Sequence, residues 1–589
     1  MKISRCLLSI FLLAALAAPL FAHAAESAAL KPVLLPRTPV TDAAWTSQAE
    51  KLHFVVVGDR TGGGITEWPL FDVAMQEINR LRPDFAIMVG DQIQGYTQDP
   101  AEIGKEWEEF RRHSNALQVP FFILPGNHDM SSPVMKEWWL KNNGRTYYSF
   151  DYKGCHFLIL NTHEHWLGND STIGPEQVQF ALDDLERSKN AQHTFVFMHV
   201  PVWQDGNSAE WKQIETALGN RAHTVFAGHL HRLTFERRND ARYIIVSTTR
   251  GLAPRRDESQ IMQLGDFAHY TNVTVENGDA KIAYIEPGGA TWPEDIATRE
   301  FQRAAREVVK VEAVPPSELD TDTARMGVRV SIANGLPKPV DVAFQTLPAA
   351  GGVWKPIEGS LTHAYTVPPS ERKDFQATFD VATAKAVPAP RIRCAVTYDG
   401  KPLYNFERNM PLFPESDLRF VDEWHAVGPF KAGTVPTVLP WFPRWSLPKL
   451  FEARGPEQGF KADATFADGD KTLTWQTLKN EGGFVNLAHL AATPDHTFGY
   501  ATCAIQCPKA KTVYAEFRAD DFGQIYVNGK GIQDERLFRT RSDATYVALP
   551  LNEGWNTLAV KVANATGGWT FRLRIADPNS ELRFAAAPE

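Results

Sequence analysis

Apolar and polar residues alternate in two different ways along residues 51–290. Short, continuously apolar runs such as 52–57 have the length and the pattern of buried strands. The segments between them, such as 69–81, place apolar residues at the three- and four-residue spacing of one helix face. Fully apolar strands that alternate with helices indicate a sheet that is covered on both faces. The pattern therefore predicts an α/β domain, for which we take the bounds 51–297.

After about residue 300 the pattern changes to short strands without intervening helices. Residues 328–332 and 392–396 alternate polar and apolar positions with a period of two, which is typical of strands that bury one face. Further along, the apolar run 524–527 is followed by Asn528-Gly529, a strong signal for a hairpin turn. The sequence predicts two all-β sandwich domains, with the bounds 309–415 and 416–589.

The first 24 residues have the three parts of an export signal. Basic residues lie at the start, an apolar run covers residues 7–20, and the small-x-small sequence at 22–24 suits cleavage. A membrane anchor is the alternative, but the run is shorter than the roughly 20 apolar residues of a transmembrane helix. We expect a signal peptide at 1–24, a linker at 25–50, and a periplasmic or secreted mature protein without a transmembrane segment.

Composition narrows the classes of protein to consider. A chain of 589 residues is too long for one hydrophobic core, and 43% hydrophobic with 22% charged residues excludes a mostly disordered chain. The net charge of −9 argues against a nucleic-acid scaffold, which normally carries a basic surface. Five cysteines are too few for a disulfide scaffold, although Cys503 and Cys507 are close enough in sequence to pair if the geometry allows it.

Six polar residues follow apolar strands of the α/β domain, most of them after a glycine. In such sheets the carboxyl ends of the strands are where ligands collect. Carboxylate, amide and imidazole groups together suit Mn, Fe, Zn or Ni, and paired ions about 3.5–4 Å apart suit phosphoryl chemistry. The pattern predicts a metal site made by Asp59, Asp91, Asn127, His199, His229 and His231.

These residues lie in five short sequence blocks that follow one another across the α/β domain. The blocks are Gly58-Asp59-Arg60-Thr61-Gly62-Gly63, Gly90-Asp91-Gln92, Gly126-Asn127-His128-Asp129, His199-Val200-Pro201 and Gly228-His229-Leu230-His231. One block alone is a weak signal, because Gly-Asp is usually a turn and a lone histidine is usually structural. Five blocks in order are specific, and the set resembles the calcineurin-like metallophosphoesterases. The resemblance implies an α/β sandwich of two mixed β-sheets flanked by helices, with two divalent transition-metal ions as cofactors.

The resemblance also implies a reaction. It favours hydrolysis of a phosphodiester over a monoester, by a hydroxide that two metal ions activate. His128 would face the substrate phosphate and either protonate the leaving oxygen or stabilise the developing charge. Asp129 would orient His128, or else it is a turn or helix-cap residue.

The implied ligands divide between the two ions. Asp91 would bridge them. The other ligands would be Asn127, His199 and His229 for one ion, and Asp59 and His231 for the other.

One position departs from the family pattern. The first block commonly has a histidine where this chain has Thr61, whose hydroxyl is a poor substitute for imidazole. We favour a site that holds its ion with two carboxylates, His231 and water. In a second alternative His163 or His165 takes the missing place, and in a third the site is weak or empty.

Four further residues are candidates for contact with the substrate. Arg60 would grip a phosphate through two parallel hydrogen bonds, or form a structural salt bridge. Arg250 would belong to a basic rim that attracts an anion, or to a solvated run of charge. His163 and His165 would contact the substrate at the rim, or lie on the surface.

The two all-β domains carry no catalytic motif. The first looks like an immunoglobulin-type sandwich. The second resembles galactose-binding-like jelly rolls, through residues 424–430, 520–530 and 554–556. Contact with a glycan or a cell surface would use Trp441, Phe442 and Trp445, which alternatively pack between the sheets. A second functional hypothesis is therefore a carbohydrate- or surface-binding protein whose phosphoesterase-like head has lost activity.

Overall fold

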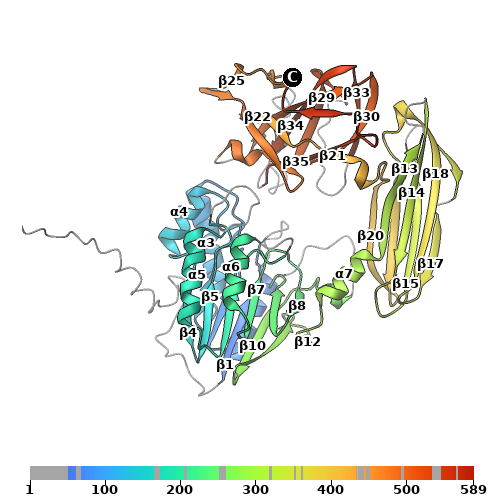
Figure 1. Ribbon diagram of the computed structural model, residues 1–589. Helices are drawn as coiled ribbons and strands as arrows, with labels where there is room; N and C mark the ends of the chain where they lie inside the picture. Colours follow the sequence, from blue (N-terminus) through green and yellow to red (C-terminus); the bar gives the residue numbers. More distant parts are fainter. Residues whose placement is uncertain are drawn as a thin grey trace, which may run out of the picture.

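The computed structural model contains three regions in chain order (Figure 1). An α/β region leads through helix α7 (Arg299–Glu307) into an all-β region of two four-stranded sheets, and a second all-β region follows. The predicted order, α/β followed by all-β, is confirmed, while the exact domain bounds and the types of the two all-β domains stay predictions. The structure describes residues 51–589 except 62–67, 165–172, 205–207, 251–260, 318–321, 350–352, 360–361, 433, 436–443, 446–451, 492–495, 533–544, 565–567 and 589.

Two six-stranded sheets form the centre of the α/β region. The first has the order β12-β11-β10-β1-β2-β3, with β1 (Leu52–Val57), β2 (Phe85–Met88), β3 (Phe121–Ile123), β10 (Tyr270–Glu276), β11 (Asp279–Ile285) and β12 (Thr291–Pro293). The second has the order β4-β5-β6-β7-β9-β8, with β4 (Tyr148–Tyr152), β5 (Cys155–Ile159), β6 (His193–Phe197), β7 (His223–Ala227), β8 (Thr234–Arg238) and β9 (Ala241–Ile245). Strands β1 to β3 are parallel, and so are β5, β6, β7 and β9. Their carboxyl ends therefore gather at one edge of each sheet.

The two sheets pack face to face through an aromatic core. The ring of Phe54 lies 5.2 Å from that of Phe85 in its own sheet and 4.9 Å from that of Phe195 in the other sheet. The neighbouring residues Val55 and Val57 point to the opposite face, where they join the core under the helices. Both faces of β1 are buried, which explains its continuous apolar run.

Helices cover the outer faces of both sheets (Figure 1). The first sheet is covered by α2 (Pro69–Leu81), α3 (Pro100–Ser114) and α4 (Pro133–Asn142), and the second by α5 (Pro175–Arg187) and α6 (Ala209–Leu218). Four of these five helices begin with proline, whose fixed backbone angle and missing N–H suit the first helical position. The result is a four-layered α/β/β/α sandwich.

The first all-β region is a two-sheet sandwich. One sheet has the order β13-β14-β18-β16, with β13 (Val309–Ser317), β14 (Thr323–Ala333), β16 (Trp354–Glu358) and β18 (Arg372–Ala382). The other has the order β17-β15-β19-β20, with β15 (Val340–Leu347), β17 (His363–Val367), β19 (Arg391–Tyr398) and β20 (Lys401–Asn409). In β19 the side chains of Ile392, Cys394 and Val396 are buried and alternate with exposed ones, as the sequence predicts.

The second all-β region is a larger antiparallel arrangement that folds around its own core. Its main strand path is β32-β31-β34-β29-β22-β27-β28-β35-β30-β33, with β21 beside β35 and β36 beside β29. The strands are β21 (Leu418–Phe420), β22 (Glu423–Lys431), β27 (Gln476–Glu481), β28 (Phe484–Asn486), β29 (Thr497–Cys507), β30 (Lys511–Asp520), β31 (Phe522–Val527), β32 (Lys530–Gly531), β33 (Thr545–Leu551), β34 (Gly554–Asn564), β35 (Thr570–Ala576) and β36 (Arg583–Ala585). Two short pairs lie beside it: β23 (Thr434–Val435) with β24 (Arg444–Trp445), and β25 (Thr465–Asp468) with β26 (Lys471–Thr474). The predicted hairpin at Asn528-Gly529 is confirmed as the turn between β31 and β32.

One disulfide considered from the sequence does not form. Cys503 and Cys507 are both free thiols and both lie on strand β29. Four residues of extended strand separate their Cα atoms by about 13 Å, well beyond the reach of a disulfide. The two cysteines are close in sequence, but the extended strand that carries both of them holds them too far apart to pair.

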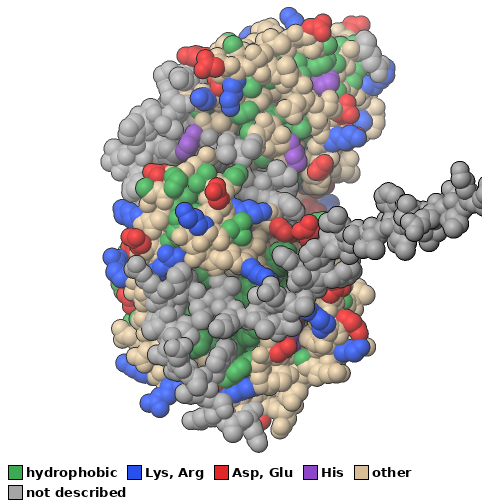
Figure 2. All heavy atoms as spheres, turned by 90° about the vertical axis from the view of Figure 1, so that its left-hand side faces the viewer, with side chains coloured by type: hydrophobic (Ala, Val, Ile, Leu, Met, Phe, Trp, Pro, Cys, Tyr) green, Lys and Arg blue, Asp and Glu red, His purple; other side chains and the backbone are tan. Residues whose placement is uncertain are grey.

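One face of the molecule mixes charges of both signs. On the face that carries α4 and α5, basic and acidic side chains are interspersed (Figure 2). Within the described residues, no helix combines the length and the apolar character needed to cross a membrane. The concentrated polar chemistry of the α/β region lies instead among buried residues at the ends of its strands.

Candidate metal centre

Six polar residues meet where the carboxyl ends of the two sheets come together. They are Asp59 after β1, Asp91 after β2, Asn127 after β3, His199 after β6, and His229 and His231 after β7. Because the strands that carry them are parallel within each sheet, all six emerge on the same edge of the α/β/β/α sandwich. The structure therefore brings together the whole set that the sequence singled out.

One part of the site, which we call the His199 side, contains Asn127, His199 and His229. One ligand atom from each of these residues lies close to the other two. His199 Nε2 lies 2.8 Å from Asn127 Oδ1 and 3.3 Å from His229 Nδ1, which is itself 2.9 Å from Asn127 Oδ1. His199 Nδ1 lies 2.8 Å from the carbonyl oxygen of Val89. A carbonyl only accepts, so Nδ1 carries a proton, and Nε2 presents a lone pair once the ring has lost its second proton. Acceptor atoms that face one another this closely suit a shared cation.

The opposite part of the site, which we call the His231 side, contains Asp59, Thr61 and His231. Ligand atoms of Asp59, Asp91 and His231 all lie within 4.8 Å of one another, and His231 Nε2 is 3.2 Å from Asp59 Oδ2. Asp59 Oδ2 also accepts a 2.7 Å hydrogen bond from the N–H of His229. Asp59 Oδ1 is buried and has no hydrogen-bond partner among the described residues. A buried carboxylate oxygen without a partner is costly, and a cation at this position would satisfy it.

The backbone around the site is shaped for close approach. A Cβ atom on Gly126 would lie 2.1 Å from Asp91 Oδ1, and one on Gly228 would lie 2.1 Å from Asp59 Oδ1. Only glycine leaves room for the carboxylates at these two turns. Asp91, His229 and His231 themselves have positive φ angles of 57°, 71° and 50°, which non-glycine residues rarely adopt. Such strained positions cluster at functional sites.

The donor set fits divalent metal ions. Asp91 Oδ1 lies 3.3 Å from His199 Nε2, and Asp91 also belongs to the group that contains Asp59 and His231. It therefore touches both sides of the site, as a bridging ligand must. The His199 side would complete the surroundings of one ion, and Asp59 with His231 would hold the other.

The charges of the site shift its pKa values in opposite directions. Burial alone would lower the pKa of His199, but the charge of Asp91 outweighs it and raises the pKa to about 9. Burial and the neighbouring His199 lower the pKa of His229 to about 4. Burial alone would raise the pKa of Asp91, but His199 and His128 hold it well below its usual range. A cation that binds the His199 side must therefore displace a proton from His199.

Thr61 is fully buried and is engaged with another side chain. Its hydroxyl donates a 2.7 Å hydrogen bond to Gln94 Oε1. The close grouping of Asp59, Asp91 and His231 agrees with the alternative in which these three residues and water hold the ion. Thr61 then supports the site through its hydrogen bond to Gln94 and does not replace a histidine ligand.

His128 is held in a defined orientation by the turn after β2. Its Nδ1 lies 2.6 Å from the carbonyl oxygen of Gln94, and its ring packs edge-on against Tyr96 at 4.8 Å. Its backbone N–H donates to Asp91 Oδ1 at 3.1 Å. Because the carbonyl only accepts, Nδ1 carries a proton and Nε2 is left to exchange a proton with a bound molecule.

The sequence left two alternatives for Asp129, and the structure does not agree with the one in which it orients His128. Its carboxylate instead accepts hydrogen bonds of 2.7–3.2 Å from four backbone N–H groups, those of Asp91, Gln92, Ile93 and Gly126. Burial and the charge of Asp91 raise the pKa of Asp129, and the backbone donors act in the opposite sense. Asp129 is thus a turn residue that ties the loop after β3 to the loop after β2.

Arg60 and Arg250 are both buried, and Arg250 lies near the carboxylates of Asp59 and Asp91. The guanidinium of Arg60 lies 3.7 Å from the centre of the Trp68 ring, so its partner is an aromatic face rather than the carboxylate of a salt bridge. Arg250 is only 2% exposed, which corrects its expected place on a rim or in a solvated run of charge. Burial lowers the pKa of both arginines to about 10, so both stay charged at neutral pH.

His163 lies beside the His199 side. Its ring centre is 5.8 Å from that of His199, it is buried, and its Nε2 has no hydrogen-bond partner among the described residues. Burial and the charge of His199 lower its pKa well below the usual value. This position contradicts a surface location for His163, and it places the ring beside His199 rather than beside Thr61. His165 lies outside the described residues.

Two residues of the site were missed from the sequence. Gln94 holds His128 through its carbonyl oxygen and Thr61 through its side chain, and the hydroxyl of Tyr96 accepts a 2.8 Å hydrogen bond from Asn127 Nδ2. Gln94 follows Asp91 by three positions and Tyr96 follows it by five, and this spacing is the only signal in the sequence. Gln94 contacts His128 through its backbone carbonyl oxygen, and a residue pattern in the sequence cannot indicate a backbone contact.

Comparisons with a family model and with solved structures found proteins that this chain is similar to. A family model described as calcineurin-like phosphoesterase matches residues 52–233, which supports a metallophosphoesterase domain there. Among solved structures, the chain is similar to GAP50, the anchor in the inner membrane complex of Plasmodium, at 16% identity over 42% of this chain and 89% of that chain, with a TM-score of 0.32. It is also similar to a dimetal phosphatase from Danio rerio, at 14% identity over 41% of this chain and 99% of that chain, with a TM-score of 0.32. None of the curated proteins compared with the chain matches it.

Proposed function

We propose that this protein is an exported, metal-dependent phosphoesterase that hydrolyses a phosphodiester. The observation that carries the proposal is the meeting of Asp59, Asp91, Asn127, His199, His229 and His231 at one edge of the sandwich, with acceptor atoms 2.8–3.3 Å apart. The family match at residues 52–233 supports a hydrolase. The N-terminal leader supports export.

The ligand residues would hold two divalent ions, which when bound polarise the ester oxygens and lower the pKa of water towards 7. The protein's own part in proton transfer falls to His128. Its Nδ1 is fixed on the carbonyl of Gln94 at 2.6 Å, and Nε2 of the doubly protonated ring would give its proton to the leaving oxygen. The packing of its ring against Tyr96 restricts that orientation further.

Arg60 and Arg250 would bind the phosphate. Both guanidinium groups are buried and charged, and Arg250 acts electrostatically on Asp59 and Asp91. Guanidinium groups form paired hydrogen bonds with phosphate oxygens, and these are stronger where water is excluded. We favour a diester because this is what the resemblance of the Gly-Asn-His-Asp block to the calcineurin-like metallophosphoesterases implies.

Metal content and hydrolysis, measured together on residues 25–589, test the proposal. We expect about two ions per chain by elemental analysis, and faster hydrolysis of bis(p-nitrophenyl) phosphate than of p-nitrophenyl phosphate. A chelator should remove both the ions and the activity. His199→Ala should lose an ion and the activity, while His489→Ala, which changes an exposed histidine of the second all-β region, should keep both. Full activity in His199→Ala would refute the assignment.

A binding protein with a degenerate head is the second candidate, and Thr61 is the observation that favours it. If the purified chain takes up no ion even after reloading, the head is not a metalloenzyme and contact with a glycan or a surface becomes the better proposal. The aromatic candidates for that contact, Trp441, Phe442 and Trp445, have side chains that lie outside the described residues.

A further inference from the structure

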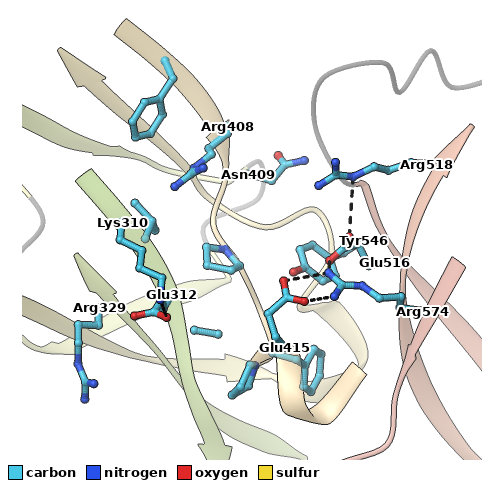
Figure 3. A pocket seen from close by; sticks show the side chains of 16 residues that line it. Lys310, Glu312, Arg329, Arg408, Asn409, Glu415, Glu516, Arg518, Tyr546 and Arg574 are labelled. Carbon is cyan, nitrogen blue, oxygen red and sulfur yellow. Dashed lines mark hydrogen bonds and ion pairs between the residues drawn. The ribbon is translucent and has the colours of Figure 1, made fainter. Parts of the chain in front are cut away.

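A charged cavity lies between the two all-β regions (Figure 3). Its volume is about 670 Å³, which is within the usual range for sites that bind small organic molecules. Strands β13, β14 and β20 contribute lining residues from the first all-β region, and β30, β33 and β35 contribute them from the second. The α/β region contributes none of its lining residues, so the cavity is separate from the metal centre.

Positive charge exceeds negative charge in this cavity. Five cations and three carboxylates line it, which leaves an excess of two positive charges. The cations are Lys310, Arg329, Arg408, Arg518 and Arg574, and the carboxylates are Glu312, Glu415 and Glu516. The protein as a whole has a net charge of −9, so this excess is a local feature and not a general property of the surface.

A rigid ion-pair network forms one wall of the cavity. Arg574 pairs with both Glu415 and Glu516, and the side chains of Arg574 and Glu516 are each only 5% exposed. Glu415 belongs to the connection that follows β20, so this network also joins the two all-β regions. Arg574 is neutralised by these partners, and we assign it a structural role.

Other polar atoms of the cavity are left unsatisfied. Arg518 Nε and Glu516 Oε1 are buried, and neither has a hydrogen-bond partner among the described residues. They lie 3.8 Å apart, which is an ion pair but is too long for a hydrogen bond. The Arg518 side chain as a whole is 41% exposed, so the end of its guanidinium group can reach a ligand in the cavity.

A second guanidinium lines the cavity from the other all-β region. Arg408 lies over the ring of Phe406 at 4.6 Å, which holds its long side chain in place. Figure 3 shows Arg408 and Asn409 on one side of the cavity and Arg518 on the other. Two like charges that line one cavity repel each other, and an anion between them would turn this repulsion into attraction.

We propose that this cavity binds an acidic oligosaccharide, with Arg408 and Arg518 gripping its carboxylate groups. Guanidinium groups suit planar carboxylates because they offer two parallel donors. A single inorganic anion would fill only a small part of 670 Å³, whereas a short chain of sugar acids also presents hydroxyl groups to Asn409. The inference is independent of the proposed hydrolase function.

Calorimetric titration of residues 25–589 with tri-galacturonate tests the proposal. We expect binding that weakens as salt is added, because the contact is between charged groups. The double variant Arg408→Gln/Arg518→Gln should bind about tenfold or more weakly, since charge-assisted hydrogen bonds are lost. Arg393→Gln is the matched control, because it removes an exposed arginine of β19 that does not line the cavity. Its affinity should equal that of the unchanged protein.

Titrations with other ligands distinguish an acidic saccharide from a free inorganic anion. A neutral trisaccharide of galactose should not bind. Sulfate or inorganic phosphate could bind as tightly as tri-galacturonate, with an affinity that falls in the double variant. This result would overturn the proposal of a saccharide ligand and assign a site for a free anion. Absence of tri-galacturonate binding, or binding that the double variant leaves unchanged, would overturn the site. Hydrolysis of bis(p-nitrophenyl) phosphate by the double variant should stay unchanged, so failure of this proposal is distinguishable from failure of the catalytic one.

Discussion

The His199 side and the His231 side of the metal centre are built from similar strand ends, yet they differ in ligand density. On the His199 side, one amide and two imidazoles place acceptor atoms within 3.3 Å of one another. The His231 side has a single imidazole, and the hydroxyl of Thr61 is engaged with Gln94. The difference between the two sides therefore lies in the residue types at the strand ends and not in the backbone scaffold.

The largest effect is expected from Asp91→Ala, which breaks both sides at once. Asp91 is the residue that reaches His199 on one side and Asp59 with His231 on the other. Hydrolysis of bis(p-nitrophenyl) phosphate should fall by about 10⁴-fold, because the stabilisation from both ions is lost. Elemental analysis should show the loss of both ions. Asp183→Ala, an exposed aspartate of α5, is the control, and a near-normal rate in Asp91→Ala would exclude a bridging role.

His128→Ala should separate chemistry from metal binding. The variant keeps its backbone N–H, which donates to Asp91, so the metal ligands stay in place. We expect kcat to fall by about 10²–10⁴-fold, as for a lost general acid. Elemental analysis of the same sample should show both ions. Loss of an ion would show that His128 is a ligand and not a proton donor.

Tyr96→Phe should weaken the His199 side alone. The change removes the hydroxyl that accepts from Asn127 Nδ2 and so orients the amide oxygen towards His199 and His229. Loss of such a supporting hydrogen bond typically weakens metal affinity by about 10–100-fold. Competition with a chelator measures the two ions separately. Tyr147→Phe, at a half-buried tyrosine that packs against Phe180, should leave both affinities unchanged. Weakening of the ion on the His231 side instead would contradict our division of the ligands.

Thr61→Ala should have the smallest effect and tests the His231 side. Loss of its hydrogen bond to Gln94 should lower the free energy of unfolding by about 1 kcal/mol. The number of bound ions should not change, because the hydroxyl is not needed as a ligand. Chemical denaturation and elemental analysis measure the two quantities. Thr61→Ser should restore the stability, and loss of one ion in Thr61→Ala would make the hydroxyl a ligand after all.

Much of the fold could be predicted because it depends on local pattern. The continuous apolar run of β1 and the alternation in β19 each reflect which faces the strand buries. Where the sequence failed, a tertiary contact decided the outcome. The sequence left Asp129 either orienting His128 or serving as a turn or helix-cap residue, and its contacts with backbone N–H groups of the loop after β2 decided for the turn. Arg250 was expected in solvent as a charged residue, yet the fold buries it near Asp59 and Asp91.

The sequence by itself determined which residues stand at the strand ends, since parallel strands must deliver them to a common edge. It also determined the chemistry of the ligand set, because carboxylate, amide and imidazole groups keep their donor character in any fold. Only the tertiary structure decided which atoms face each other. The orientation of His128 depends on the carbonyl of Gln94, and that of His199 depends on the carbonyl of Val89. Every residue carries a carbonyl, so no residue pattern marks these contacts. The pairing of β2 with β3 in one sheet brings Gln94 to His128, and the packing of the two sheets brings Val89 to His199.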